Sequence, residues 1–219
     1  MPAASRKTKP SRQTSDEHPS SGEKWALPAQ QARSRATRAK ILAAAEQVFA
    51  DKGYDGARLS DIAEVAGCSV GATYFRFKDK DTLFSAIAES FRDEARAGVG
   101  RLIEHAQGLA PDKVIRTFVT AAAANMSRHK GLFRAIVERG LDHPQAMDTI
   151  FKFRDELAAS LESVLKTKRS GLKVRVMTQM IYGFLIAGVL NRRAPTQIED
   201  TRAIAELANA CVAYFESAS

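Results

Sequence analysis

Residues 59–77, LSDIAEVAGCSVGATYFRF, are the stretch of sequence that decides the fold. The apolar side chains of its first half recur at the spacing of one helix face and are Leu59, Ile62, Ala63 and Ala66. Gly67 is placed to end this helix, and the residues after it have the length of a second short helix. Two short helices joined by a three- or four-residue turn that contains glycine form a helix-turn-helix. We therefore predict a helix-turn-helix over about residues 57–77.

The segments on both sides of this motif also have helical periodicity. The apolar residues between 41 and 49 lie on one face of a helix that Gly53 ends, and a longer helix runs from about residue 80 to His105. Further amphipathic segments follow at 111–128, 130–139, 144–166, 172–192 and 196–216. An aromatic content of 7% and many Ala, Leu, Glu, Lys and Arg residues favour helices over strands. We predict an all-α protein with an N-terminal three-helix domain and a C-terminal helical bundle.

Positive charge is concentrated near the N-terminus. The formal net charge is +8, and residues 1–40 hold nine Lys and Arg against three Asp and Glu. A basic segment of this kind attracts polyanions, either phosphate backbones or an anionic membrane. Residues 1–32 are rich in Ser, Pro, Lys and Arg and poor in apolar side chains, so we expect a disordered basic arm there.

A longer stretch around the motif carries a family resemblance. Residues 37–84, TRAKILAAAEQVFADKGYDGARLSDIAEVAGCSVGATYFRFKDKDTLF, resemble the N-terminal domain of the tetracycline-repressor (TetR) family of bacterial regulators. The likeness rests on Ile-Leu-x-Ala-Ala, Phe-Ala-x-x-Gly-Tyr, Asp-Ile-Ala-x-x-Ala-Gly and Gly-x-x-Tyr-x-x-Phe-x-x-Lys. The resemblance implies a DNA-binding domain over 33–94 and a helical effector-binding and dimerisation domain over 95–219. It also implies a homodimer that binds double-stranded operator DNA as a repressor and is released by a small-molecule effector.

The second helix of the motif is the element expected to read DNA, because the N-terminal residues of a recognition helix meet base edges. Here those residues are Val70, Gly71, Ala72 and Thr73. Val70 and Ala72 are suited to thymine methyl groups, whereas Thr73 either bonds a base or packs inward. We expect Ser69 to cap this helix by accepting a hydrogen bond from the N–H of Ala72, and we count it with the DNA-binding residues.

Charged and phenolic side chains near the motif are candidates for phosphate contacts. The resemblance implies that Tyr74, Arg76 and Lys80 hold the DNA backbone, which fixes register without reading sequence. The alternatives are a half-buried aromatic side chain for Tyr74 and solvated charges for the other two. Arg38 belongs to the basic segment before the motif. In other DNA-binding proteins, arms in this position contact DNA. Arg58 stands where the family usually has Ser or Thr, and it either contacts a phosphate or is simply exposed.

The remaining residues of the motif have structural interpretations. Asp61 is placed to accept a hydrogen bond from the N–H of Arg58 and to complement the helix dipole. Cys68 lies in the turn, where we expect it to act as a small hydrophobic residue. The side chains expected in the core or half-core are Leu59, Ile62, Ala63, Val65, Phe75 and Phe77.

In the helical domain, the candidate pocket residues are large apolar side chains at helical spacing together with a few polar ones. They are Phe118, Asn125, Met126, Phe133, Arg139, Met177, Gln179 and Tyr182. Ordinary core packing explains each of them as well. An apolar pocket of about 300–1,000 Å³ favours a ligand-binding regulator. A solid core favours the alternative, a DNA-binding structural or partner-controlled protein of the same fold with no small-molecule effector.

The sequence lacks the motifs of catalysis and of metal binding. The four histidines are scattered, and the chain has no glycine-rich phosphate loop and no Gly-x-Ser-x-Gly. Its two cysteines exclude a disulfide framework and a cysteine zinc site. We therefore expect no enzyme activity, no cofactor and no metal. The first residues lack an apolar secretory core, and the longest apolar run, 176–190, is short for a membrane span, so we expect a cytoplasmic protein with no membrane partner.

Overall fold

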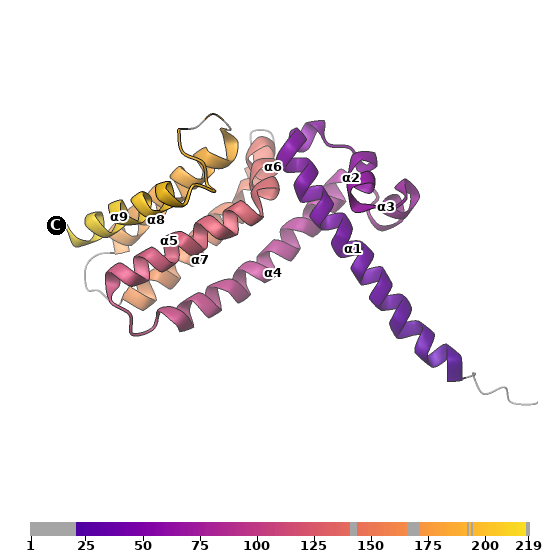
Figure 1. The fold of residues 1–219 in the computed structure, drawn as a ribbon, viewed down its shortest axis with the longest axis horizontal. Helices are drawn as coiled ribbons and strands as arrows, with labels where there is room; N and C mark the ends of the chain where they lie inside the picture. The colour runs from indigo at the N-terminus through magenta and orange to yellow at the C-terminus, as the bar shows by residue number, and fades with distance from the viewer. Residues whose placement is uncertain (1–20, 141–143, 166–170, 192, 194, 218–219) are drawn as a thin grey trace, which may run out of the picture. The chain divides into compact units, whose positions relative to one another are not determined.

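The architecture is helical throughout the residues that the computed structural model describes, which are 21–140, 144–165, 171–191, 193 and 195–217. Their helices are α1 (Ser21–Gly56), α2 (Leu59–Ala66), α3 (Val70–Arg76), α4 (Lys80–Ala106), α5 (Pro111–Arg128), α6 (Lys130–Gly140), α7 (Pro144–Leu165), α8 (Gly171–Leu190) and α9 (Thr201–Glu216). Figure 1 shows their arrangement. The prediction of an all-α protein is confirmed.

Helix α1 begins earlier than the sequence pattern indicated. We expected a disordered arm over residues 1–32, but the chain is helical from Ser21, so the prediction is wrong for residues 21–32. Residues 1–20 lie outside the described residues. The segment from Ala29 onward is rich in Ala, Gln and Arg, which are strong helix formers, and an exposed helix has no apolar stripe for periodicity to detect. The chain divides into two compact units after Thr37, and the helix-turn-helix and the helices that follow it belong to the second unit.

Helices α2 and α3 form the predicted helix-turn-helix. Helix α2 ends at Gly67, whose φ of 64° and ψ of 37° lie in the left-handed region that glycine adopts without steric cost. The N–H of Gly67 donates to the carbonyl of Glu64 at 3.1 Å, and the N–H of Cys68 donates to the carbonyl of Ala63 at 3.0 Å. These bonds satisfy carbonyl groups at the end of α2 and turn the chain into α3.

An aromatic cluster holds the end of α1 against the start of α4. The ring of Tyr54 lies 5.4 Å from that of Phe49 and 5.6 Å from that of Phe84, measured between centroids. The predicted break at Gly53 is present, because this residue has a non-helical φ of 73° and ψ of 173°. The break places Tyr54 beside α4, where its ring packs edge-on against Phe84.

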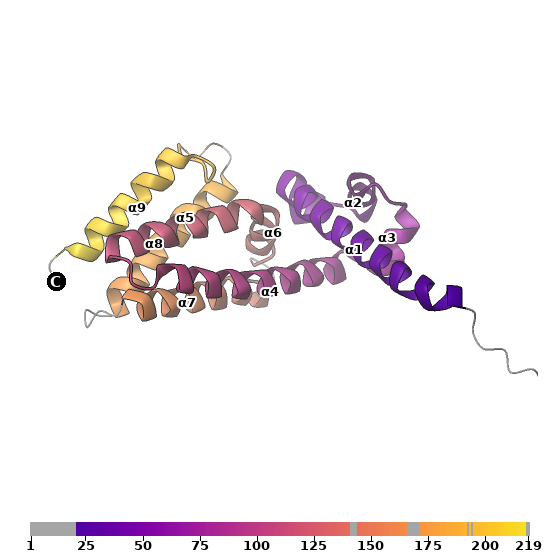
Figure 2. The same ribbon diagram turned by 60° about the horizontal axis from the view of Figure 1, so that its bottom comes forward.

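Helices α4 to α9 pack together in the second part of the chain. Helix α5 lies along α9, and α7 contacts α4, α6 and α8. Figure 2 shows the same neighbours from a second direction. The apolar stripe predicted for the last helix is buried and consists of Ile204, Leu207, Ala208, Cys211, Val212 and Phe215. Helix α9 begins at Thr201 and not at residue 196, because the side chain of Asp200 caps it by accepting from the N–H of Arg202 at 2.9 Å.

Helix α8 is apolar around most of its circumference. Within the described part of the chain, it is the one helix that is long and apolar enough to cross a membrane by length and composition. Half of its most apolar window is buried inside the structure. A core helix with one uncovered face has this degree of burial.

Candidate nucleic-acid interface

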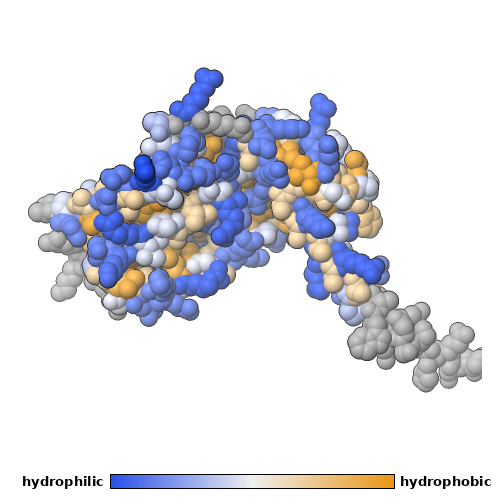
Figure 3. All heavy atoms as spheres, in the orientation of Figure 1, coloured by the Kyte–Doolittle hydropathy of each residue, from blue (hydrophilic) through white to orange (hydrophobic). Residues whose placement is uncertain are grey.

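The outward face of α3 is apolar. Val70 is 44% exposed, and Tyr74, one helical turn further on the same face, is 53% exposed. Gly71 faces open space, because a Cβ atom built on it meets no atom within 4 Å. Figure 3 shows exposed apolar atoms in orange at the end of the view that carries α2 and α3. The predicted contact residues Val70, Gly71 and Tyr74 therefore reach the surface, and Tyr74 is not the half-buried aromatic residue of the alternative.

Two apolar side chains of the motif lie outside although we predicted them in the core or half-core. Phe75 is 87% exposed and Val65 is 46% exposed, so both predictions are wrong. A helix turns by about 100° per residue, and in the short α3 the inward positions fall to Thr73 and to Phe77 just after it. Phe77 is buried as predicted.

Ser69 caps α3 as predicted. Its Oγ accepts a hydrogen bond from the N–H of Ala72 at 3.1 Å. Thr73 is completely buried, with its Oγ1 3.4 Å from the carbonyl oxygen of Ser69 and 3.4 Å from Sγ of Cys68. Of the two possibilities for Thr73, the structure shows inward packing, and the base contact is wrong. Ala72 is half-buried at the edge of the exposed face.

Arg76 lies back along its own helix. Its Nη1 donates to the carbonyl of Ala72 at 3.1 Å. Its Nε is buried and has no hydrogen-bond partner among the described residues. The side chain is half-buried, not the solvated charge of the alternative. A phosphate contact by Arg76 requires that the guanidinium leave the Ala72 carbonyl.

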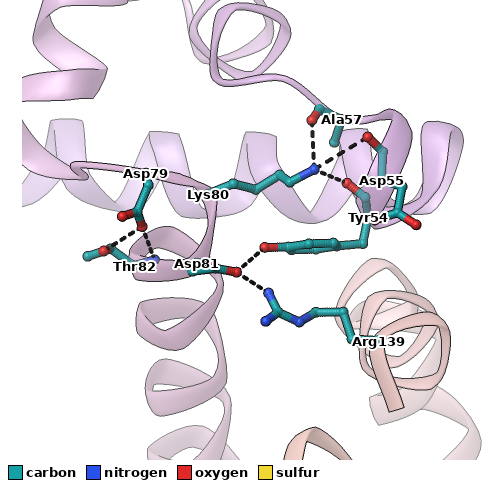
Figure 4. Close-up of polar contacts among 8 residues, drawn as sticks. All are labelled: Tyr54, Asp55, Ala57, Asp79, Lys80, Asp81, Thr82 and Arg139. Carbon is teal, nitrogen blue, oxygen red and sulfur yellow. Dashed lines mark hydrogen bonds and ion pairs between the residues drawn. The ribbon is translucent and has the colours of Figure 1, made fainter. Parts of the chain in front are cut away.

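Lys80 does not project toward solvent as a phosphate anchor. Its ammonium donates to the carbonyl of Tyr54 at 2.6 Å, to that of Ala57 at 3.2 Å and to that of Asp55 at 3.4 Å. Figure 4 shows the three bonds converging on Nζ. An ammonium group has three donors, and all three are used. The expected phosphate role is therefore replaced by a structural one, because Lys80 satisfies carbonyl groups where α1 ends.

The Tyr54 ring is the centre of a polar junction with α6. Its hydroxyl donates to Oδ1 of Asp81, which also pairs with Nη1 of Arg139 (Figure 4). The guanidinium carbon of Arg139 lies 4.4 Å from the centre of the Tyr54 ring. Burial raises the pKa of Tyr54, and the hydrogen bond to Asp81 raises it further. Arg139, predicted as a polar pocket residue, thus lies against the DNA-binding domain, and that prediction is wrong.

The two remaining arginines of the predicted interface are exposed. Arg38 and Arg58 both point their charge to solvent, and Arg58 makes no side-chain cap at the start of α2. Asp61 bonds to the backbone of Arg58 as predicted. The ammonium of Lys52 lies 2.8 Å from Asp61 and holds the pKa of that carboxyl below its usual value. These placements leave Arg38 and Arg58 available to phosphate groups.

Helix α6 is bonded to the main chain of α1, a connection that the sequence reading missed. Glu138 Oε2 accepts from the backbone N–H of Tyr54 at 2.7 Å, and Arg134 Nη1 donates to the carbonyl of Ala50 at 2.7 Å. Arg134 Nε also donates to Glu138 Oε1 at 2.8 Å. The only local signal was the i,i+4 spacing of Arg134 and Glu138, which predicts a helix-surface pair and nothing about α1.

A close contact continues this junction. Gly131 lies so near to Glu46 that a Cβ atom on it would fall against the Glu46 carbonyl oxygen. The buried His129 has its Nδ1 3.1 Å from Oε2 of Glu46. Helix α6 and the turn before it therefore meet the second half of α1 through Gly131, His129, Arg134 and Glu138, and we call this set the α1–α6 junction.

A cavity of about 380 Å³ lies between α4, α5 and α7 and opens to solvent. Its apolar wall includes Val99, Leu102 and Phe153 together with several alanines. Arg101, His105 and Arg128 are its titratable residues, and no acidic residue is among the described residues that line it. The cavity falls in the size range of small-molecule sites and is positively charged.

The cavity coincides with only one of the eight predicted pocket residues, Asn125. Five others are buried in the core and do not line this cavity, namely Phe118, Met126, Phe133, Met177 and Tyr182. Gln179 is exposed and accepts a hydrogen bond from Arg154 at 3.2 Å. Large side chains fill the space that they point into, so a cavity occurs where the residues are small, as at Ala95 and Gly98. Our choice of large side chains therefore favoured core positions.

Metal-binding geometry is not found in the described part of the chain. No group of three or more His, Cys, Asp or Glu residues there is arranged to hold a metal ion. The buried Cys211 stands alone in the core, and burial raises the pKa of its thiol to about 11.

A family match falls on the part of the chain that holds this interface. Residues 41–87 match the family described as "Bacterial regulatory proteins, tetR family". The HTH-type transcriptional repressor AcnR of Corynebacterium glutamicum is 31% identical over 124 residues, which are 54% of this chain and 63% of AcnR. The HTH-type transcriptional repressor BepR of Brucella suis is 46% identical over 56 residues, which are 26% of this chain and 27% of BepR. The chain thus matches less than two thirds of the length of these relatives.

Solved structures share the fold over most of the chain. A putative TetR-family transcriptional regulator from Mesorhizobium loti superimposes with a TM-score of 0.61 at 22% identity, over 84% of this chain and 95% of that one. A regulatory protein of the tetR family from Rhodococcus RHA1 gives a TM-score of 0.62 at 20% identity, over 84% of this chain and 98% of that one. At these identities the likeness concerns the fold alone.

The described residues form an all-helical fold with an N-terminal helix-turn-helix and a C-terminal helical domain, and the solved TetR-family structures share this fold. The N-terminal part of the chain resembles the TetR family of bacterial regulatory proteins, whose family description matches residues 41–87.

Proposed function

We propose that this protein is a sequence-specific DNA-binding transcriptional repressor of the cytoplasm that acts as a homodimer and has no enzymatic activity. The observation that carries the proposal is the exposed face of α3 inside a domain that matches the tetR family. A recognition helix in this position enters the major groove of DNA. Repression is supported by the relatives AcnR and BepR, which are named transcriptional repressors.

The charged residues around α3 supply the electrostatic part of DNA binding. Arg38 and Arg58 are exposed and hold phosphate groups, and the phenol of Tyr74 donates a hydrogen bond to the backbone. Lys80 takes no part, because its ammonium is bound to three carbonyl groups of the protein. Each phosphate contact adds to the salt dependence of binding.

The dimer forms through α8 and α9. Three large apolar side chains of α8 are exposed on the same face of the helix and are Leu172, Met180 and Leu190. Gly183 and Ala187 lie between them on that face and are also exposed, so a second helix can approach closely. A two-fold axis pairs this face with its copy, which is the commonest geometry of homodimers.

The effector site is the cavity between α4, α5 and α7. Its apolar wall and its cations Arg101 and Arg128 fit an amphipathic ligand with a negatively charged group. Helix α4 carries Arg101 at the cavity and Asp81 at the Tyr54 contact, so one helix joins the two sites. Ligand binding shifts α4 and with it the recognition helix, and the protein leaves its operator.

The DNA-binding proposal is tested by selecting duplexes from a randomised pool with the full-length protein. We expect an enriched pseudo-palindrome with half-sites about one helical turn apart, and a dimer in sedimentation equilibrium. A pool with no enriched sequence, or a monomer bound to an asymmetric site, contradicts the proposal.

The effector is tested separately from DNA binding. A medium-chain fatty carboxylate serves as the anionic amphipathic probe, and the alcohol of the same chain length serves as the neutral control. We expect the carboxylate to release the selected duplex, whereas the alternative, a structural or partner-controlled DNA-binding protein, predicts the same DNA affinity with and without the probe.

A further inference from the structure

The exposed face of α3 offers DNA apolar surface instead of hydrogen-bonding groups. Val70 and Tyr74 form its outer row, Gly71 leaves a gap beside them, and Phe75 continues the apolar surface. The Tyr74 hydroxyl is the one polar side-chain group on this face within α3.

The other polar residues of α3 each bond a group of the protein. Thr73 is buried, with its hydroxyl against the Ser69 carbonyl and the Cys68 sulfur. Arg76 donates to the carbonyl of Ala72. Readout of guanine, adenine or cytosine in the major groove rests on polar side chains that bond their edges, most often arginine, lysine, asparagine or glutamine. Among the described residues of α3, no such side chain lies free on the outer face.

Thymine differs from the other three bases in the groups that it presents to a protein. In the major groove, thymine carries a C5-methyl group, which is the apolar contact that the groove offers to a protein. Val70 gains free energy when its exposed surface is covered by a methyl group, whereas a polar base edge under Val70 loses water without gaining a partner. Gly71 allows this approach, because no side chain holds the α3 backbone away from the groove.

We propose that Val70 reads thymine C5-methyl groups, so that each operator half-site contains at least one thymine whose methyl group contributes to affinity while its hydrogen-bonding edge does not. This inference rests on the proposed DNA-binding function. It specifies the chemistry that α3 recognises and predicts an operator whose half-sites are rich in thymine under the N-terminal part of α3.

The test removes single methyl groups from DNA. In a duplex selected by the full-length protein, each thymine is replaced in turn by deoxyuridine, which pairs identically and lacks only the C5-methyl group. At one or more positions of each half-site we expect affinity to fall about fourfold, the factor that corresponds to burying one methyl group. Replacing the sensitive thymine by cytosine should also weaken binding, and 5-methylcytosine at the same position should restore part of the affinity.

Protein variants assign the methyl contact to a side chain. The Val70→Ala variant should bind the thymine duplex more weakly than the parent protein does. It should also bind the thymine duplex and the duplex with deoxyuridine at the sensitive position equally well. Val65→Ala is the matched control, because Val65 is 46% exposed against 44% for Val70 but belongs to α2. Both side chains are exposed, so both variants should melt at the temperature of the parent protein.

The outcomes separate the two proposals. If a specific duplex is selected and deoxyuridine at every thymine leaves affinity unchanged, methyl readout is wrong and DNA binding stands. If Val70→Ala keeps the full deoxyuridine effect, the contact belongs to another residue and the inference about Val70 is wrong. If no duplex is enriched and the exposed face of α3 binds an apolar protein surface instead, both proposals fall.

Discussion

The backbone N–H of Tyr54 donates a hydrogen bond to Oε2 of Glu138, 2.7 Å away and 84 residues further along the chain. This bond joins the DNA-binding domain directly to α6, in addition to the continuous helix α4. The same carboxylate accepts from Arg134, which itself donates to the carbonyl of Ala50. One side chain of α6 thus holds the point where α1 breaks.

Replacement of Glu138 by alanine should loosen this connection. The Tyr54 N–H and Nε of Arg134 both lose their acceptor, whereas Nη1 of Arg134 keeps the Ala50 carbonyl. A hydrogen bond to a charged group contributes about 1.5–3 kcal/mol. Glu138 is partly exposed, so we expect the lower part of that range in urea denaturation. Glu138→Gln keeps an acceptor oxygen and should lose less stability. Equal losses in the two variants would show that charge alone matters at this position.

Replacing glycine by alanine should have opposite effects on stability at Gly131 in the α1–α6 junction and at Gly100 in α4. Gly131→Ala places a methyl group against the Glu46 carbonyl and should cost about 1–3 kcal/mol, because α1 and α6 must move apart. Gly100→Ala in α4 meets no atom within 4 Å and should stabilise the protein by about 0.5–1 kcal/mol, since alanine favours the helix. Thermal unfolding of both variants measures the difference, and a neutral Gly131→Ala would contradict the close packing.

Lys80 and Arg58 should respond differently to substitution. Lys80→Met removes an ammonium that is bonded to three carbonyls, so we expect a loss of about 1–3 kcal/mol in unfolding free energy and an unchanged salt slope of DNA binding. Arg58→Gln should leave stability nearly unchanged and flatten that slope by about one unit, as the loss of one phosphate contact does. A flattened slope for Lys80→Met would restore the phosphate role.

Cys211 should make stability fall at alkaline pH. Burial raises the pKa of its thiol from 9.0 to about 11, so the folded state favours the neutral form. This contribution is fully present below about pH 9 and is lost as the pH rises toward about 11, because only the unfolded chain ionises easily in that window. Urea denaturation between pH 8 and pH 11 should show a steeper loss for the parent protein than for Cys211→Ala. Cys68→Ala is the control and should keep the steep loss.

The arginines of the cavity predict that its affinity for a ligand depends on the charge of the ligand. Arg101→Gln should weaken binding of the fatty carboxylate by about two- to fivefold and leave binding of the alcohol unchanged, because an exposed ion pair contributes up to about 1 kcal/mol. Arg96→Gln, on the same helix but outside the cavity, should change neither. Calorimetry measures both ligands. If the carboxylate is an effector, it weakens DNA binding by about 5- to 150-fold, and operator DNA must weaken carboxylate binding by the same factor.

Local sequence patterns predicted the helix-turn-helix, the Ser69 cap and the buried stripe of α9, because each depends on residues a few positions apart. Patterns failed where a partner lies far along the chain. The acceptors of Lys80 are 23 to 26 residues away, and Asp81, the partner of Arg139, is 58 residues away. The cavity was missed for another reason, since periodicity identifies which side chains point inward but not where small residues leave space.

The α1 side of the junction with α6 consists largely of main-chain groups, namely the N–H of Tyr54 and the carbonyls of Ala50 and Glu46. Main-chain groups are the same whichever side chain they carry. Mutations that retune operator preference in the N-terminal domain therefore leave these attachment points intact, provided that glycine is kept at position 53. A DNA-binding domain from a relative can therefore be joined to this α6 if it also carries the side chains that contact α6 and the turn before it, which are Glu46, Tyr54 and Asp81.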